Sequence, residues 1–219
     1  MDEFDFEAYK QMVKEHQEKD EPTSWCDSIY KDAHGDYTKV FWADLESNPY
    51  LLQYLKNNKT KNKKAIVIGC GVGDDAKSLS DAGYNVTAFD ISPSAIELCK
   101  KRYPHSKIDF LVADLFSYPP NWFENYDLVY ECNTIQILAG KYRILAREKI
   151  SSLLNKGGKA VISCRSRREG KQENDIPKPL DKKEMNAFMY KDNLKELLFT
   201  DYYDNQEPAI WHFFAVYQK

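Results

Sequence analysis

Three glycines and an acidic residue are spaced along the chain in a way that suits nucleoside binding. Residues 68–76 read IGCGVGDDA and place Gly69, Gly71 and Gly73 directly after a short apolar run. Glycines let the backbone turn sharply and let a ligand approach the main chain. Asp90 ends the next apolar run, 21 residues after Gly69, where a carboxylate accepts hydrogen bonds from ribose hydroxyls in dinucleotide folds. The pattern predicts a nucleoside site.

Two further acids beside the glycines discriminate between nucleotides. The NAD fingerprint G-x-G-x-x-G requires glycine at position 74, whereas this chain has Asp74 followed by Asp75. At the amino end of a helix, two carboxylates would repel a pyrophosphate. No GK[ST] follows the glycines, so a Walker loop is also excluded. S-adenosylmethionine has no phosphate and carries a sulfonium and an ammonium group, so the residues favour it over a dinucleotide.

An alternation of apolar runs and helical or turn segments indicates how these residues are positioned. Five predicted strands cover residues 65–69, 86–90, 108–113, 126–131 and 159–163. Strand–helix alternation is typical of a parallel sheet that is covered on both faces. Two later runs, 194–204 and 209–218, are joined by a short connection and are therefore expected to be antiparallel. The predicted fold class is α/β, Rossmann-like and doubly wound, with a mostly parallel seven-stranded sheet and an antiparallel pair at its C-terminal end.

Capping signals predict where several helices begin and end. Ser92-Pro93 is an N-cap followed by a proline at the first helical position. Gly83 is expected to end the helix before the second strand, and Gly157-Gly158 the helix before the fifth. Asp181 and Glu184 have the spacing of a capping box, which predicts a helix that starts there.

The residues before the first strand are predicted to be helical. An amphipathic pattern covers residues 4–18, and Asn48-Pro49 starts another helix. We therefore expect one domain over 1–219, with a helical N-terminal cap and linker over 1–63 and a Rossmann-like core over 64–219. The polar segment 165–180 carries two prolines and is predicted to be a loop.

Composition excludes several classes of function. The chain has 219 residues, is 42% hydrophobic and has a net charge of −3, which argues against a nucleic-acid binder. No apolar run approaches the roughly 20 residues that span a bilayer, and the first ten residues lack the apolar stretch of a secretion signal. The five cysteines are never closer than 29 residues apart, which predicts reduced thiols and no metal site. We expect a cytoplasmic monomer that binds neither nucleic acid nor a membrane.

Four sequence segments resemble class I S-adenosylmethionine-dependent methyltransferases. They are IGCGVGDDA, FDIS around Asp90, VADLF around Asp114, and LLNKGGKAVI before the fifth strand. The chain is further similar to the thiopurine and thiol/halide methyltransferase branch, which has a helical cover with spaced tryptophans and a proline-containing loop like residues 176–180 here. It departs from the thiopurine enzymes at Cys132, where they carry an arginine, and in having Ile-Pro-Lys-Pro for Gly-Pro-Pro.

The resemblance implies methyl transfer from S-adenosylmethionine to a small-molecule nucleophile, a thiol or similar soft nucleophile. A small-molecule N- or O-methyltransferase, a nicotinamide-dependent oxidoreductase and a catalytically silent S-adenosylmethionine-binding module stay open as alternatives. We assign no catalytic base, because a thiol is appreciably ionised near neutral pH. His34, His105 and His212 stand alone in the sequence and are read as surface or packing residues.

The resemblance also implies two sets of site residues. The expected cofactor-binding residues are Trp42, Gly69, Gly71, Gly73, Asp90, Ile91, Asp114, Leu115 and Glu131. The expected acceptor-binding residues are Trp25, Tyr30, Cys132, Gln136 and Arg165.

Each of the less certain side chains has a structural alternative. The aromatic residues of the second set, with Trp42, are either core residues of the N-terminal helices or a group that caps the sulfonium through cation–π contacts. Asp114 either contacts the adenine amino group or caps a helix, and Glu131 either contacts the ligand or is a buried structural acid. Arg165 is either a solvated residue or a clamp for an anionic acceptor, and Cys132 is either a reactive thiol or a packing residue.

Overall fold

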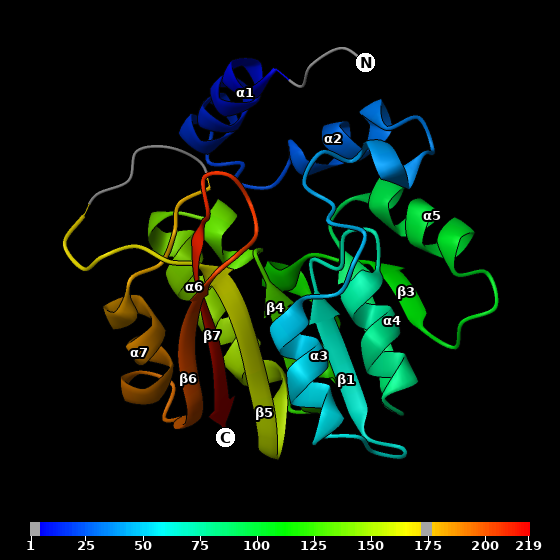
Figure 1. Ribbon diagram of the computed structural model, residues 1–219, viewed down its shortest axis with the longest axis vertical. Helices are drawn as coiled ribbons and strands as arrows, with labels where there is room; N and C mark the ends of the chain where they lie inside the picture. The colour runs from blue at the N-terminus through cyan, green and yellow to red at the C-terminus, as the bar shows by residue number, and fades with distance from the viewer. Residues whose placement is uncertain (1–4, 172–176) are drawn as a thin grey trace.

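A computed structural model describes residues 5–171 and 177–219 (Figure 1). Its seven-stranded sheet has the order β3-β2-β1-β4-β5-β7-β6. The pairs from β3 through β5 are parallel, while β7 is antiparallel to both β5 and β6. The predicted fold class is confirmed. The strands are β1 (Lys64–Ile68), β2 (Asn85–Asp90), β3 (Asp109–Val112), β4 (Tyr126–Cys132), β5 (Leu154–Arg165), β6 (Lys195–Tyr203) and β7 (Trp211–Gln218).

Helices cover both faces of the sheet because the buried strands are apolar on both sides. One core cluster joins a sheet face to α3, α4 and α5, and the other joins the opposite face to α6 and α7. Four 3₁₀ turns complete the described elements: η1 (Tyr37–Lys39), η2 (Leu115–Ser117), η3 (Pro120–Trp122) and η4 (Ile135–Ile137). The α-helices are α1 (Phe6–Glu18), α2 (Cys26–Asp32), α3 (Pro49–Lys56), α4 (Asp74–Asp81), α5 (Pro93–Arg102), α6 (Gly140–Leu153) and α7 (Lys182–Tyr190).

Three of the predicted caps are present. The Ser92 hydroxyl accepts from the Ala95 N–H at 3.0 Å and starts α5. Asp181 and Glu184 form the reciprocal capping box of α7. Gly83 follows α4 with a φ of +94°, and a Cβ there would lie 1.9 Å from the Thr60 carbonyl oxygen, so only glycine fits.

The prediction for Gly157-Gly158 is wrong, because both residues lie inside β5 and do not end a helix. Helix α6 ends at Leu153, and the chain becomes extended at Leu154, which is fully buried and pairs with Tyr126 of β4. The register of this pair shifts between positions 126 and 128. A Cβ at Gly158 would lie 2.8 Å from the Tyr126 carbonyl oxygen, so glycine allows the close approach of two strands at an irregularity.

The N-terminal segment lies at one end of the sheet. Helices α1 and α2 lie at the top of Figure 1, above the end of the sheet toward which β1 points. The predicted helix over 4–18 is observed as α1, and residue 4 itself lies outside the described residues. None of the helices within 5–171 and 177–219 has the length and apolar character that crossing a membrane requires. The division into a cap over 1–63 and a core over 64–219 stays a prediction.

Candidate active site

The glycine loop links β1 to α4 and is enclosed from two sides. Gly69, Gly71 and Gly73 have φ values of +58°, +54° and +91°, a region that side-chain-bearing residues rarely adopt. A Cβ at Gly69 would lie 2.3 Å from the Thr134 hydroxyl, and one at Gly71 would lie 3.3 Å from the Tyr30 hydroxyl. The loop is therefore packed between the residues after β4 and helix α2, and its backbone needs glycine at these positions.

Asp90 lies at the end of β2 and fixes the glycine loop. Its carboxylate accepts from the Gly71 N–H at 3.0 Å and from the Ser92 N–H at 2.9 Å, and the residue is 6% exposed. Burial raises the pKa of Asp90 to about 6, although the backbone N–H groups oppose this shift. Each carboxylate oxygen can accept a second hydrogen bond, so the predicted ribose contact is compatible with both backbone bonds. Ile91, the next residue, packs against an N-terminal apolar cluster.

The two acids after the glycines do not present free charges to a ligand, contrary to the sequence argument. Asp74 is bound by both terminal nitrogens of Arg102 at 2.7 Å. Asp75 accepts from the Asn48 N–H at 2.8 Å, and burial raises its pKa to about 6. The electrostatic reason for excluding a pyrophosphate is therefore wrong for Asp74, whose charge is neutralised by an arginine 28 residues away in the sequence.

Five aromatic side chains, Tyr9, Trp25, Tyr30, Phe41 and Trp42, form a cluster above the glycine loop. The Trp42 ring lies 5.5 Å from Tyr30 and 6.1 Å from Trp25, and its indole N–H donates to the Tyr30 hydroxyl at 3.2 Å. Trp25 is 2% exposed and donates to the Pro22 carbonyl, which corresponds to the core alternative. Trp42 is only partly buried, so it is the tryptophan of this pair with surface available to a ligand.

The residues after β3 also have a structural role. Asp114 accepts from the Phe116 N–H at 2.8 Å and so caps the 3₁₀ turn η2. Leu115 is buried in the core cluster that includes α6. The adenine contact predicted for this segment stays a prediction, and the capping alternative for Asp114 is present.

Glu131 is a fully buried acid at the end of β4. One of its oxygens accepts from the N–H groups of Thr134 and Ile135 at 2.6 and 2.8 Å. The other oxygen is enclosed and has no hydrogen-bond partner among the described residues. Burial raises the pKa of Glu131 to about 7, although both N–H bonds oppose the shift. Glu131 thus shapes the turn that brings Thr134 against Gly69, which agrees with the structural alternative.

Replacing Glu131 with Gln is expected to remove a pH dependence of stability. The pKa of Glu131 in the folded protein, about 7, lies above its ordinary value of 4.5. The contribution of this group to stability is therefore fully present below pH 4.5 and is lost as the pH rises through 7. Gln keeps the acceptor for both N–H groups and cannot ionise. The difference in unfolding free energy, variant minus wild type, should therefore be larger at pH 8 than at pH 5. The increase should be on the order of 3 kcal/mol at most.

Urea unfolding at the two pH values measures this difference. The matched control is Glu97→Gln on the exposed side of α5, for which no such improvement is expected. An equal pH response in Glu131→Gln and wild type would contradict the assignment.

Three of the predicted acceptor residues lie along the ends of β4 and β5. Cys132 is partly buried, and burial raises the pKa of its thiol well above the usual value, so it is not an activated nucleophile. The Gln136 side-chain oxygen accepts from the Arg165 N–H at 2.6 Å. The Arg165 guanidinium is partly exposed, and no hydrogen bond or ion pair to it is formed within the described part of the chain.

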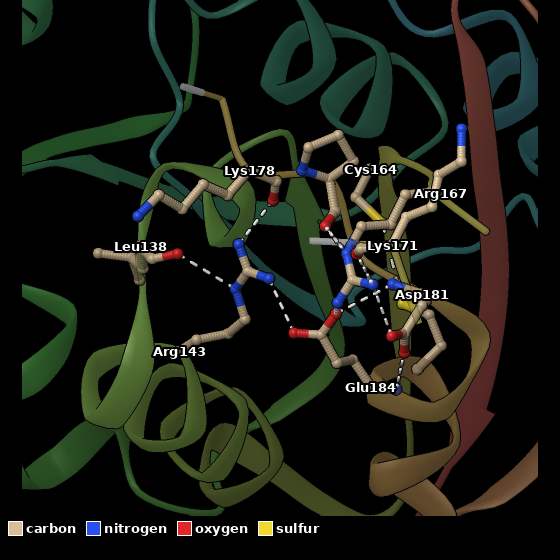
Figure 2. Close-up of polar contacts among 10 residues, drawn as sticks. Leu138, Arg143, Cys164, Arg167, Lys171, Lys178, Asp181 and Glu184 are labelled. Carbon is tan, nitrogen blue, oxygen red and sulfur yellow. Dashed lines mark hydrogen bonds and ion pairs between the residues drawn. The ribbon is translucent and has the colours of Figure 1, made fainter. Parts of the chain in front are cut away.

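A network of ion pairs joins α6 and α7 to the described residues Arg167 and Lys178 that follow β5 (Figure 2). Glu184 at the start of α7 binds Arg143 and Arg167 at 2.7 and 2.8 Å. Arg143 also donates to the carbonyls of Leu138 and Lys178, so α6 is joined to α7 and to Lys178 before it. Apart from the capping box, no local sequence signal indicates this network, because its partners are up to 41 residues apart.

Asn48 forms a second polar cluster on the sheet face that α3 covers. Its side-chain amide donates to the hydroxyls of Ser163 and Tyr202 at 3.1 and 3.2 Å and lies 3.9 Å from the Cys132 sulfur. The side-chain oxygen of the same residue caps α3. The sequence signal Asn48-Pro49 identified the cap and gave no indication of the long-range contacts.

Comparison with known proteins identifies the domain. The profile of a family described as "Methyltransferase domain" matches residues 65–158, a segment that contains the glycine loop, Asp90 and Glu131. The chain carries a class I S-adenosylmethionine-dependent methyltransferase domain. This finding confirms the resemblance to class I S-adenosylmethionine-dependent methyltransferases that the sequence predicts.

The curated relatives of this methyltransferase domain match over part of their length. The chain is 27% identical over 124 residues to a probable thiol methyltransferase 2 of Arabidopsis thaliana, covering 55% of this chain and 54% of that protein. Over 98 residues it is 35% identical to a malonyl-[acyl-carrier protein] O-methyltransferase of Anoxybacillus flavithermus, covering 44% and 36%. The chain thus spans about half the length, or less, of these curated relatives.

Solved structures share the fold of the methyltransferase domain at low identity. The N1-methyltransferase of Burkholderia thailandensis that acts on 1,6-didemethyltoxoflavin has a TM-score of 0.70 at 14% identity and covers 90% of each chain. The N-methyltransferase NodS of Bradyrhizobium japonicum has a TM-score of 0.67 at 16% identity, covering 87% of this chain and 98% of that chain. A [4+2]-cyclase is also similar, with a TM-score of 0.63. The fold alone therefore does not determine the reaction.

Proposed function

We propose that this protein transfers the methyl group of S-adenosylmethionine to a small-molecule soft nucleophile, a thiol in the first instance. The observation that carries the proposal is the glycine loop anchored by buried Asp90, within a segment matched by a methyltransferase profile. The thiol acceptor is supported by the thiol methyltransferase relative.

The residues fit S-adenosylmethionine in two respects. The positive φ values and close neighbours of the glycine loop form a cradle that a Cβ would fill, and Asp90 has acceptor capacity left for two ribose hydroxyls. We propose that Gly69, Gly71, Gly73 and Asp90 hold the nucleoside, and that Trp42 lies toward the sulfonium end. When bound, the cofactor supplies an electrophilic methyl group, and the chain's own part is to orient the acceptor and exclude water.

An O-methyltransferase is the second candidate, because the relative at 35% identity is named as a malonyl-[acyl-carrier protein] O-methyltransferase. No observation on this chain favours small-molecule N-methylation, an oxidoreductase or a cofactor-binding module over these two candidates.

We also propose that the protein acts as a monomer in the cytoplasm. Its five cysteines are all free thiols, which supports a reducing compartment.

Turnover of an acceptor panel tests the proposal. Thiols, halide ions, carboxylic acids and small amines are incubated with S-adenosylmethionine, and release of S-adenosylhomocysteine is measured. We expect the highest kcat/KM with a thiol. Preference for a carboxylic acid would replace the thiol proposal by the O-methyltransferase candidate, and binding of S-adenosylhomocysteine without any turnover would support the silent binding module instead.

A further inference from the structure

His212, which stands alone in the sequence, lies in a polar site next to the carboxyl end of β5. It is the second residue of β7 and pairs with Arg165 on β5 and with Tyr202 on β6. The imidazole stacks on the Tyr202 ring at 5.1 Å and is 6% exposed. Because β7 is antiparallel to β5, the start of β7 places His212 at the end of the sheet where the parallel strands finish.

The two ring nitrogens of His212 differ in their partners. Nε2 lies 3.0 Å from the Asp204 carboxylate, whose other oxygen accepts from the N–H groups of Ile210 and Gln206. Burial works against ionisation of Asp204, but these N–H groups and His212 outweigh it and lower the pKa of Asp204. Because an ionised carboxylate only accepts, Nε2 must carry the hydrogen.

Nδ1 is the unusual atom of this site. It is enclosed and has no hydrogen-bond partner among the residues that the structure describes. Burial lowers the pKa of His212 below 6.5 in spite of Asp204, so the ring is neutral at pH 7 and Nδ1 carries a free lone pair. An unpaired buried acceptor costs stability, and a role in proton transfer is one reason to keep it.

The charged groups that face the ring are Asp204, Arg165 and Asp44. Arg165 lies opposite His212 in the strand register, and its positive charge disfavours a protonated imidazole. Its guanidinium makes no hydrogen bond or ion pair within residues 5–171 and 177–219, so a change in its position would break none. Asp44 is exposed in the segment that leads to α3.

A short chain of contacts connects this site to the glycine loop. Thr134 packs against Gly69, and Gln136, two residues later, binds the Arg165 N–H at 2.6 Å. Arg165 in turn pairs with His212. The cofactor loop and the histidine therefore both lie at the end of the sheet where the parallel strands finish.

We propose that His212, oriented by Asp204, is the base that removes the proton from the methyl acceptor. This inference rests on the proposed function. The X–H proton of the acceptor moves to Nδ1 while the lone pair of X forms the bond to the methyl carbon and the methyl–sulfur bond breaks. Asp204 stabilises the resulting imidazolium, which returns its proton to water. This base replaces the expectation from the sequence that none is needed: only a few per cent of an aliphatic thiol is ionised at pH 7, and His212 acts on the protonated majority.

His212→Gln tests the role, because its amide can still donate to Asp204 but does not act as a base. Two acceptors are compared: an aliphatic thiol, which is mostly protonated at pH 7, and a nitrothiophenol, which is ionised. General-base catalysis typically contributes about 100- to 10,000-fold, so kcat/KM for the aliphatic thiol should fall at least about 100-fold and that for the nitrothiophenol less than about threefold. Equal losses with both acceptors, or no loss with either, would overturn the proposal.

The matched control is His105→Gln, an exposed histidine after α5, for which neither rate should change. A thermal melt of each variant confirms that it folds. In wild type, the acidic limb of the pH–rate profile should report the His212 pKa with the aliphatic thiol and should be absent with the nitrothiophenol.

A second measurement is independent of turnover. Nitrogen-15 spectra of histidine-labelled protein with S-adenosylhomocysteine should show His212 neutral, with the hydrogen on Nε2, and the Nδ1 signal should shift when an aliphatic thiol is added. A hydrogen on Nδ1 at pH 7, or no shift with saturating thiol, would contradict the role of His212. If wild type turns over no acceptor at all, the proposed function fails, while the spectra still decide whether Nδ1 is free and meets a thiol.

Discussion

Replacing Asp90 with Asn is expected to weaken binding of S-adenosylhomocysteine about 10- to 100-fold. The substitution keeps the shape of the side chain but replaces one acceptor oxygen with an NH₂ group, which then faces the Gly71 or Ser92 N–H. A hydrogen bond to a charged group contributes about 1.5–3 kcal/mol, and each 1.4 kcal/mol is tenfold in affinity. The substitution should weaken the ribose contact and loosen the attachment of the glycine loop to the end of β2.

Calorimetric titration measures the affinity, with Asp81→Asn as the matched control. Asp81 is an exposed acid at the end of α4 that pairs with Lys77, so its loss changes the net charge by the same amount away from the glycine loop. We expect wild-type affinity for the control. Wild-type affinity for a folded Asp90→Asn protein would remove Asp90 from the site, and equal weakening in both variants would point to net charge as the cause.

The elements that carry Asp90 and the glycine loop were predictable because their signals are local. A buried strand, a glycine turn and a capped helix each depend on neighbouring residues, and the antiparallel pair follows from one short connection. The prediction for Gly157-Gly158 is wrong because it too depends on a local signal alone. A glycine pair is compatible with a helix end or with an irregular strand, and the choice depends on the distant Tyr126.

Side-chain partners across the fold were not predictable. His212 stands alone in the sequence, yet β6 and β7 bring Asp204 to its Nε2, and the register with β5 places Arg165 opposite. Similarly, nothing local shows that Glu184 binds two arginines from different elements. These pairs depend on strand order and loop path, so periodicity alone carries no information about them.

The pairing of Asp74 with Arg102 has the largest consequence, because the sequence alone predicts a free charge at Asp74. The two side chains are 15% and 14% exposed, and Arg102 also donates to the Val72 carbonyl beside the glycine loop. The cofactor assignment therefore rests on the methyltransferase profile and the loop geometry. What the chain gains from Asp74 is a rigid attachment of α5 to the start of α4.

Arg102→Met is accordingly expected to lower the free energy of unfolding by about 2 kcal/mol, since removing one partner of a partly buried pair leaves the other charge without its partner. The attraction of Asp74 to the amino end of α4 offsets only part of this loss. Chemical unfolding measures it, and adding Asp74→Asn to Arg102→Met should recover part of the loss by removing the orphaned charge. The matched control is Lys77→Met, which breaks an exposed pair with Asp81 and should cost less than about 1 kcal/mol. If Arg102→Met cost no more than this control, Asp74 would be solvated, and the original picture of a free anion beside the glycines would be restored.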